Sequence, residues 1–232
     1  MAPVEIPPLA RRSVSTPVVL AAHLERLIAT GQVAAGDRLP SERDLAASLS
    51  VSRATLREAM HELEAKNLIE RRPGRGTVVV APSDAERALL DLSSPSSEAR
   101  DAAELREIVE PSVAGLAARR ATPANLLQLR EVLDRTTPRL RPEASLACDT
   151  EFHLLVARAA RNPLLATLHT MVAEWTMDVR RHSHTTAEGR RTSREGHLAI
   201  FAAIEAHDAD AAQRAMSEHL GDVRRLVAAR GD

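Results

Sequence analysis

After the first 15 residues, apolar residues recur at helical spacing and predict three short helices. The first helix starts at Thr16-Pro17, where a hydroxyl N-cap precedes a proline. The second starts at Ser41, which Asp44 completes in the manner of a capping box, and the third starts at Ser52. The inward-facing side chains of the three helices are Leu20, Leu24, Leu27, Ile28, Leu45, Ala46, Leu49, Leu56, Met60 and Leu63.

A tight turn and a hairpin complete this first region. Ser50 lies in the turn between the second and third helices, where glycine is often used for its freedom at positive φ. Asn67 is suited to a left-handed helix stop. Residues 68–72 and 77–81 have the composition of strands on either side of a turn rich in glycine and proline. Helices, turn and hairpin together predict a winged helix-turn-helix.

From about residue 98 the pattern becomes entirely helical. Thr122-Pro123 and Asn162-Pro163 are clear helix starts. The predicted helices span residues 98–119, 123–136, 142–160, 163–182, 187–206 and 208–229. We therefore predict a mainly α protein in four parts: a disordered tail (1–15), a winged helix-turn-helix domain of three helices and a two-stranded wing (16–82), a linker (83–97) and an all-α bundle of about six helices (98–232).

Composition narrows the functional classes. The chain has 232 residues and a net charge of −1, so a DNA contact must come from a local basic face rather than from a global field. Cys148 is the only cysteine, which excludes an internal disulfide and fits a reducing cytoplasm. The sequence has no apolar run of about 18 residues that would span a membrane. Aromatic residues are too rare to form a stacking platform for single-stranded nucleic acid.

Basic residues gather at the start of the third helix, where a helix-turn-helix meets DNA. The N-terminal residues of this helix are expected at base edges in the major groove. Arg53 and Arg57 are four residues apart, so they project from one face, and each guanidinium suits guanine or phosphate. Arg43 belongs to the helix that crosses the DNA backbone, where phosphate is the expected partner. The other residues expected at the duplex are Ser52, Thr55, Arg75 and Gly76.

Solvated arginines on a small helical domain are the plainer explanation, but capped helices and a wing in the same order favour DNA. Residues 16–81 also resemble the N-terminal domain of GntR-family bacterial transcription regulators. The resemblance rests on residues 36–43, 45–46, 51–53, 56–59, 63, 68–69 and 74–76. It implies a homodimer that binds double-stranded operator DNA. Ser50 and Asn67 depart from the family pattern, which commonly has Gly at both positions.

Four polar residues of the second half occupy positions where apolar residues are expected. Asp149 and His153 share a helix face, and His197 and His219 each interrupt an apolar stripe. Burying these groups separately is costly, whereas a shared divalent cation such as Zn²⁺, Ni²⁺, Mn²⁺ or Fe²⁺ would satisfy all four. Hydrogen-bonded core histidines and a simple intrahelical pair are the alternatives. Four other histidines compete as ligands, of which the last two are expected to be exposed: His169, His207, His182 and His184.

Residues 98–230 are similar to the FCD ligand-binding domain of the GntR branch named for its fatty-acid-responsive member. The similarity rests on residues 105–111, 117–118, 149–153, 161–164, 195–200, 206–208 and 216–220. It implies a metal held by Asp149, His153, His197 and His219. It also implies that Arg106 helps to bind an effector carboxylate, although Glu110, one turn along, is an equally available partner.

The resulting hypothesis is a cytoplasmic transcription regulator, and more specifically a repressor, that is no enzyme. Its helical domain would bind a metal and a small organic acid that modulates operator binding. One alternative comes from another class of protein, a metal-dependent hydrolase fused to a DNA anchor. A second alternative is a regulator for which the metal itself is the signal. A purely structural metal is a further possibility.

Overall fold

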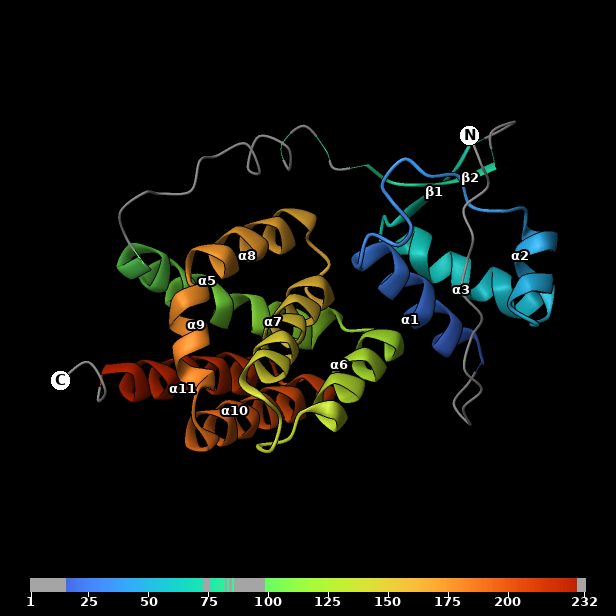
Figure 1. Ribbon diagram of the computed structural model, residues 1–232. Coiled ribbons are helices and arrows are strands. Elements are labelled where there is room, and N and C mark those ends of the chain that lie inside the picture. The colour runs from blue at the N-terminus through green and yellow to red at the C-terminus, as the bar shows by residue number, and fades with distance from the viewer. Residues whose placement is uncertain (1–15, 73–75, 82, 84, 86–98, 229–232) are drawn as a thin grey trace. The chain divides into compact units, whose positions relative to one another are not determined.

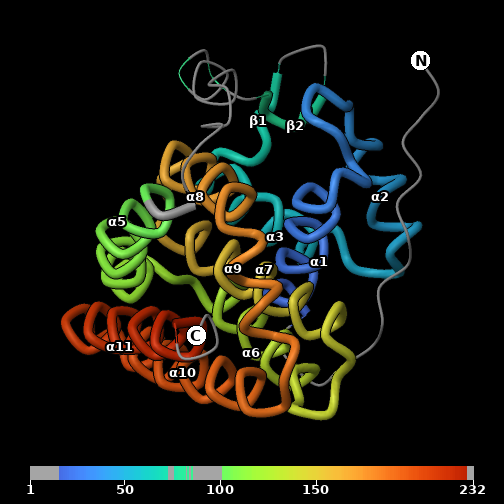
Figure 2. Tube along the Cα trace, turned by 60° about the vertical axis from the view of Figure 1, so that its left-hand side comes forward, coloured from blue at the N-terminus to red at the C-terminus, as the bar shows by residue number. Residues whose placement is uncertain are grey.

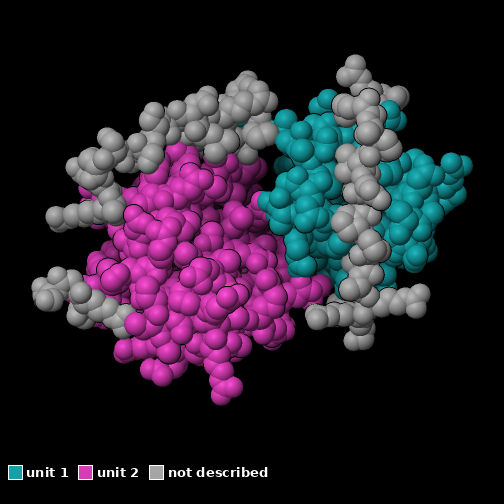
Figure 3. Space-filling view, in the orientation of Figure 1, with its two compact units in different colours: residues 1–83 teal, residues 84–232 magenta. Residues whose placement is uncertain are grey.

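The computed structural model describes residues 16–72, 76–81, 83, 85 and 99–228. The predicted tail (1–15), most of the predicted linker (83–97) and Arg75 lie outside the described residues. The chain forms two compact units, Met1–Ser83 and Asp84–Asp232, which Figure 3 shows in different colours.

The first unit is a winged helix-turn-helix (Figure 1). Its helices are α1 (Thr16–Ala29), α2 (Glu42–Ser48) and α3 (Arg53–Ala65), and its strands are β1 (Ile69–Arg72) and β2 (Gly76–Val79). The strands pair antiparallel, with Ile69 opposite Val79 and Arg72 opposite Gly76. Strand β1 begins one residue later than predicted, and β2 begins one residue earlier and ends two residues earlier than predicted.

Side-chain caps start both helices of the DNA-reading motif. Ser41 Oγ accepts a hydrogen bond from the Asp44 backbone N–H, and Ser52 Oγ accepts one from the Thr55 backbone N–H. The predicted capping box at α2 is wrong in its second half. The Asp44 carboxylate accepts from the Ser41 hydroxyl at 2.6 Å and from Arg43, so these two donors replace the backbone N–H of Ser41.

The two non-glycine residues expected at left-handed positions have that conformation. Ser50 has φ 54° in the turn between α2 and α3, and Asn67 has φ 56° after α3. Both residues let the chain reverse where glycine would be the easier choice. His207, which lies between the last two helices, also has a left-handed backbone, with φ 56°.

The second unit is all helical. Its described helices are α5 (Ala99–Arg120), α6 (Pro123–Arg135), α7 (Pro142–Ala159), α8 (Pro163–Trp175), α9 (Met177–His184), α10 (Ala187–Glu205) and α11 (Ala209–Ala228). The prediction of one helix over 163–182 is wrong, because the chain leaves helical geometry at Thr176 (φ −100°, ψ 10°). The Thr176 hydroxyl donates to the Val172 carbonyl at 2.8 Å, a bond that bends helices.

Helices α10 and α11 lie side by side in Figures 1 and 2, and α5 and α11 also pack together. Their shared core includes Val113, Phe152, Ile200, Ile204 and Met216. Polar residues on α5, α7, α10 and α11 are buried together with this apolar core. The packing of the bundle therefore brings distant polar positions of the sequence into one place.

Candidate metal centre and DNA-binding surface

Three helices bring the four predicted metal ligands together. Asp149 and His153 lie on α7, His197 on α10 and His219 on α11. Each residue offers one ligand atom, and these four atoms all lie within 4.8 Å of one another. All four side chains are buried, with relative exposures between 1% and 4%. Residues that are far apart in the sequence thus form one compact donor set.

The separations within this set fit a common ion. His153 Nε2 lies 3.2 Å from both His197 Nε2 and His219 Nε2, and His197 Nε2 lies 3.3 Å from Asp149 Oδ1. An ion about 2.1 Å from each ligand sets neighbouring ligand atoms about 3.0–3.4 Å apart in octahedral or tetrahedral geometry. Three imidazoles and a carboxylate are the donors that Zn²⁺, Ni²⁺, Mn²⁺ and Fe²⁺ accept.

Burial keeps the three imidazoles neutral, which is the form that binds metal. Loss of solvation lowers the pKa of His153 from 6.5 to about 3, against the opposing effect of Glu110. Burial also lowers the pKa of His197 and holds the pKa of His219 well below its usual value. Phe152 stacks on His197 with ring centroids 4.2 Å apart and fixes the plane of that ring.

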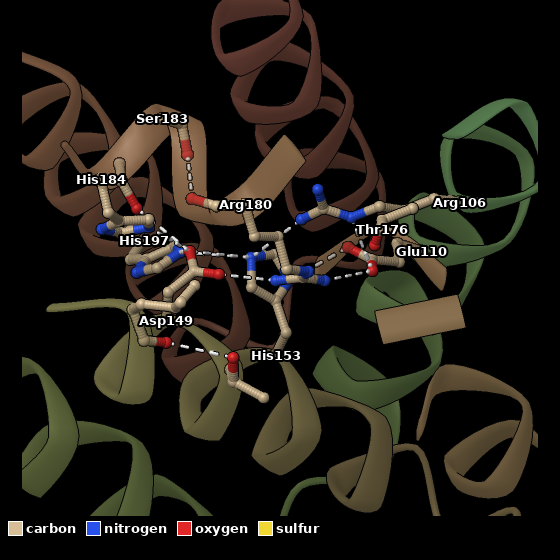
Figure 4. Close-up of polar contacts among 12 residues, drawn as sticks. Arg106, Glu110, Asp149, His153, Thr176, Arg180, Ser183, His184 and His197 are labelled. Carbon is tan, nitrogen blue, oxygen red and sulfur yellow. Dashed lines mark hydrogen bonds and ion pairs between the residues drawn. The ribbon is translucent and has the colours of Figure 1, made fainter. Parts of the chain in front are cut away.

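Asp149 is held by a shell of polar groups, of which the sequence singled out only His184, as a competing ligand (Figure 4). Arg180 Nη1 donates to Asp149 Oδ2 at 2.6 Å, and Ser193 Oγ donates to Asp149 Oδ1 at 3.2 Å. His184 Nε2 lies 3.4 Å from the same Oδ1. Burial alone would raise the pKa of Asp149, but the charge of Arg180 and hydrogen bonds with His184 and His197 hold it well below its usual value. The carboxylate is therefore ionised and oriented.

The expectation that His184 is exposed is wrong, whereas His182 is exposed as predicted. His184 is only 3% exposed, and its Nδ1 lies 2.8 Å from Ser145 Oγ. Positions 176, 180 and 184 are four residues apart, so they share one face of the chain around α9. A polar face of this kind usually meets water, and the sequence contains no signal that α9 turns it toward the core.

Arg106 pairs with Glu110, the simpler of the partners that the sequence analysis considered. Its Nε donates to Glu110 Oε1 at 2.9 Å, one turn along α5, and its Nη2 lies 3.4 Å from His153 Nε2. Arg180 Nη2 donates to the same Glu110 oxygen at 3.1 Å. Arg106 therefore lies against the donor set and shares its carboxylate partner with a second buried arginine (Figure 4).

Unpaired polar atoms surround this centre. Five buried side-chain atoms of the cluster have no hydrogen-bond partner among the residues that the structure describes: Glu110 Oε2, His153 Nδ1, His169 Nε2, Arg180 Nε and His219 Nδ1. His153 Nδ1 and Glu110 Oε2 are only 3.0 Å apart, but they are not aligned as a hydrogen bond. Such unpaired atoms are costly in an apolar core. Their concentration here distinguishes this cluster from the apolar core around it.

The basic residues predicted for DNA lie on the surface of the first unit. Arg43, Arg53 and Arg57 are all exposed, and Ser52 Oγ lies 2.8 Å from Thr55 Oγ1 at the start of α3. Two of the arginines have acidic neighbours: Arg57 Nε donates to Glu42 at 3.1 Å, and Arg43 Nε lies at the same distance from Asp44.

Arg53 differs from them, because it makes no ion pair with the part of the chain that the structure describes. Of the two predicted wing residues, only Gly76 is described, with φ 76°, and the side chain of Arg38 covers it. A Cβ atom at Gly76 would lie 3.1 Å from Arg38 Nε, so the arginine packs directly on the base of the wing.

Family models match both units. The model of bacterial regulatory proteins of the gntR family matches residues 18–79, and the FCD domain matches residues 101–222. The chain belongs to the GntR family. A transcriptional repressor, NanR of Cronobacter sakazakii, is 32% identical over 226 residues, which cover 93% of this chain and 86% of that protein. The Uxu operon transcriptional regulator of Escherichia coli is 32% identical over 206 residues, 83% of this chain and 79% of that protein.

A solved GntR structure from Streptococcus agalactiae covers 90% of this chain and 99% of its own, at 28% identity and a TM-score of 0.45. The relatives are transcription regulators, so this GntR protein is a regulator and not an enzyme. Assignment to the fatty-acid-responsive branch stays a prediction, because the relatives named above are NanR and the Uxu regulator. No helix among the described residues combines the length and apolar character that crossing a membrane requires.

Proposed function

We propose that this GntR protein is a cytoplasmic, homodimeric repressor whose operator binding responds to a small carboxylate held beside a divalent metal. The convergence of four buried ligand atoms within 4.8 Å carries the proposal. NanR, which is 32% identical, is a repressor, and this supports repression here. The two compact units and the two family matches support the proposed domains at 16–82 and 98–232, joined by a linker at 83–97.

Asp149, His153, His197 and His219 would hold the ion. When bound, it supplies positive charge and an open coordination position for an anionic oxygen. Arg180 and Ser193 orient Asp149, and the neutral imidazoles present their lone pairs without having to lose protons first. This donor set supports either Zn²⁺ or one of Ni²⁺, Mn²⁺ and Fe²⁺.

Charge balance supports an anionic effector. Two buried guanidinium groups, Arg106 and Arg180, are matched by two buried carboxylates, Glu110 and Asp149. A divalent cation adds two positive charges to a cluster that is otherwise neutral. Buried excess charge is costly unless it is paired, so an anion bound beside the metal would stabilise the loaded centre.

The first unit would read DNA through α3. Arg53, Arg57 and Thr55 would lie in the major groove, Arg43 and Ser52 at the backbone, and Gly76 with Arg75 at the wing. The acidic partner of Arg43 is exposed and that of Arg57 is half-buried at the surface, so both arginines can be released at little cost. Arg53 needs no such release.

A gel-shift titration with the protein's own promoter region tests the proposal. Metal analysis of the same preparation is run first, and the shift is then compared in chelator, in each candidate metal, and with small carboxylates added. We expect a sequence-specific shift that weakens when carboxylate is added to the metal-loaded dimer. A response to metal alone would make the metal the signal, and no sequence-specific shift at moderate salt would contradict DNA reading altogether.

Substitution of Arg53 by Ala separates specific from general contacts. Because a bidentate contact with guanine contributes about 1–3 kcal/mol, Arg53→Ala should weaken operator binding by about fivefold to 150-fold and relax specificity. Arg214→Ala, an exposed arginine on α11, is the control and should leave binding unchanged. Equal effects of the two variants would place Arg53 outside the interface.

A further inference from the structure

A second cavity lies beside the metal centre. It has a volume of about 280 Å³ and is formed by residues of α5, α9 and α11. Three of its wall positions are Arg106 itself, Val179 next to Arg180, and Leu220 next to His219. The cavity therefore borders the centre on the side of Arg106, and its size is at the lower end of ligand pockets, about 300 Å³.

The wall of this cavity is mainly apolar. Its hydrophobic lining residues are Ala103, Val179, Leu220, Val223, Val227 and Ala228. The charged wall residues other than Arg106 are Glu107 and Arg224, which already satisfy one another. Arg224 Nη1 lies 3.0 and 2.8 Å from the two Glu107 carboxylate oxygens, and the arginine side chain is 65% exposed. This pair belongs to the solvent side of the cavity.

Arg106 offers the cavity one unused donor. Its Nε binds Glu110, and its Nη2 lies against His153. Its Nη1 has no hydrogen bond to any residue that the structure describes, and Figure 4 shows one terminal nitrogen of Arg106 without a contact. Arg106 is itself a wall residue of the cavity, so a guanidinium group borders this space.

We propose that this cavity is the apolar subsite of the effector, which makes the effector a monocarboxylate with a compact hydrocarbon body. The inference rests on the proposed function and narrows it. The carboxylate binds at Arg106, at the inner end, and the hydrocarbon part lies between α5, α9 and α11. Glu107 disfavours the opposite orientation, because it would place two carboxylates together at the mouth.

The same wall argues against a highly hydroxylated acid in this position. Each hydroxyl group brought into the cavity would leave water and find alanine, valine or leucine in place of a hydrogen-bond partner. A methylene group, in contrast, gains about fourfold in affinity for each one buried. Chain length and hydroxylation therefore have opposite effects on affinity.

Calorimetry on the full-length, Zn²⁺-saturated protein tests the inference with acetate, butyrate, hexanoate and glucuronate as probes. We expect affinity to rise about fourfold per added methylene until the cavity is filled, and glucuronate to bind more weakly than hexanoate. Equal affinity for the three alkanoates, or tighter binding of glucuronate, would overturn the apolar subsite and leave the metal-and-carboxylate proposal standing. Failure of all four acids to bind would contradict both proposals.

Two variants locate the hydrocarbon part, and one locates the carboxylate. Ala103→Leu fills the cavity and should reduce hexanoate binding at least tenfold while sparing acetate. Ala202→Leu, at an exposed position on α10, is the matched control and should change neither. Val227→Thr keeps the side-chain volume and should weaken hexanoate selectively. Arg106→Gln should weaken the binding of every carboxylate probe. Unchanged hexanoate affinity in both Ala103→Leu and Val227→Thr would place the ligand elsewhere.

Discussion

Arg180 is the residue on which the electrostatics of the centre depend. It is 1% exposed and bridges Asp149 and Glu110, so its removal leaves buried Asp149 without its guanidinium partner and leaves Glu110 with Arg106 alone. We expect Arg180→Gln to lower the free energy of unfolding by about 3–5 kcal/mol. Its neighbour Arg181 is 63% exposed and pairs with an exposed aspartate, so Arg181→Gln should change the free energy of unfolding by about 0.5 kcal/mol or less. Urea unfolding of both variants measures the difference, and equal stabilities would deny Arg180 this role.

At the scale of elements, the approach of α10 to α11 positions one metal ligand. A Cβ atom at Gly196 on α10 would lie 2.4 Å from His219 Nδ1 and 2.9 Å from His219 Cβ. Gly196→Ala should therefore displace His219, weaken metal binding and lower the free energy of unfolding by about 1–3 kcal/mol. Gly221→Ala on α11 meets only the end of Arg225 at 3.4 Å and should stabilise the helix by about 0.5–1 kcal/mol. Chelator competition and thermal unfolding check both variants. Unchanged metal affinity in Gly196→Ala would show that α10 and α11 can move apart without displacing His219.

For the whole molecule, buried neutral histidines make stability depend on pH. Burial lowers the pKa of His153 from 6.5 to about 3 and also lowers the pKa values of His197 and His219. Below pH 6.5 these histidines are therefore protonated in the unfolded chain but stay neutral in the folded chain. The metal-free protein should be most stable above pH 6.5 and lose up to about 1.4 kcal/mol per pH unit for each histidine as the pH falls toward 3. Denaturant unfolding in chelator at pH 7.5, 6.5 and 5.5 measures this, and stability that is constant or rises on acidification would contradict it.

The sequence predicted the donor set but not the groups around it, for a physical reason at each position. Apolar stripes are interrupted at Asp149, His153, His197 and His219, and such interruptions can be recognised from the sequence alone. Arg180 and His184 lie on a helix whose polar face looked like an ordinary solvent face. This polar face is buried because the chain bends at Thr176, and helical periodicity does not predict a local bend. Left-handed Ser50 and Asn67 were predictable, because a turn forced the backbone there.

Arg106 belongs to α5, the first described helix after residues 83–97, and this helix begins only two turns before the guanidinium. Under the proposed function, an acid bound at Arg106 would act on the helix that follows residues 83–97 in the sequence, and so on the part of the bundle nearest in sequence to the DNA-binding unit.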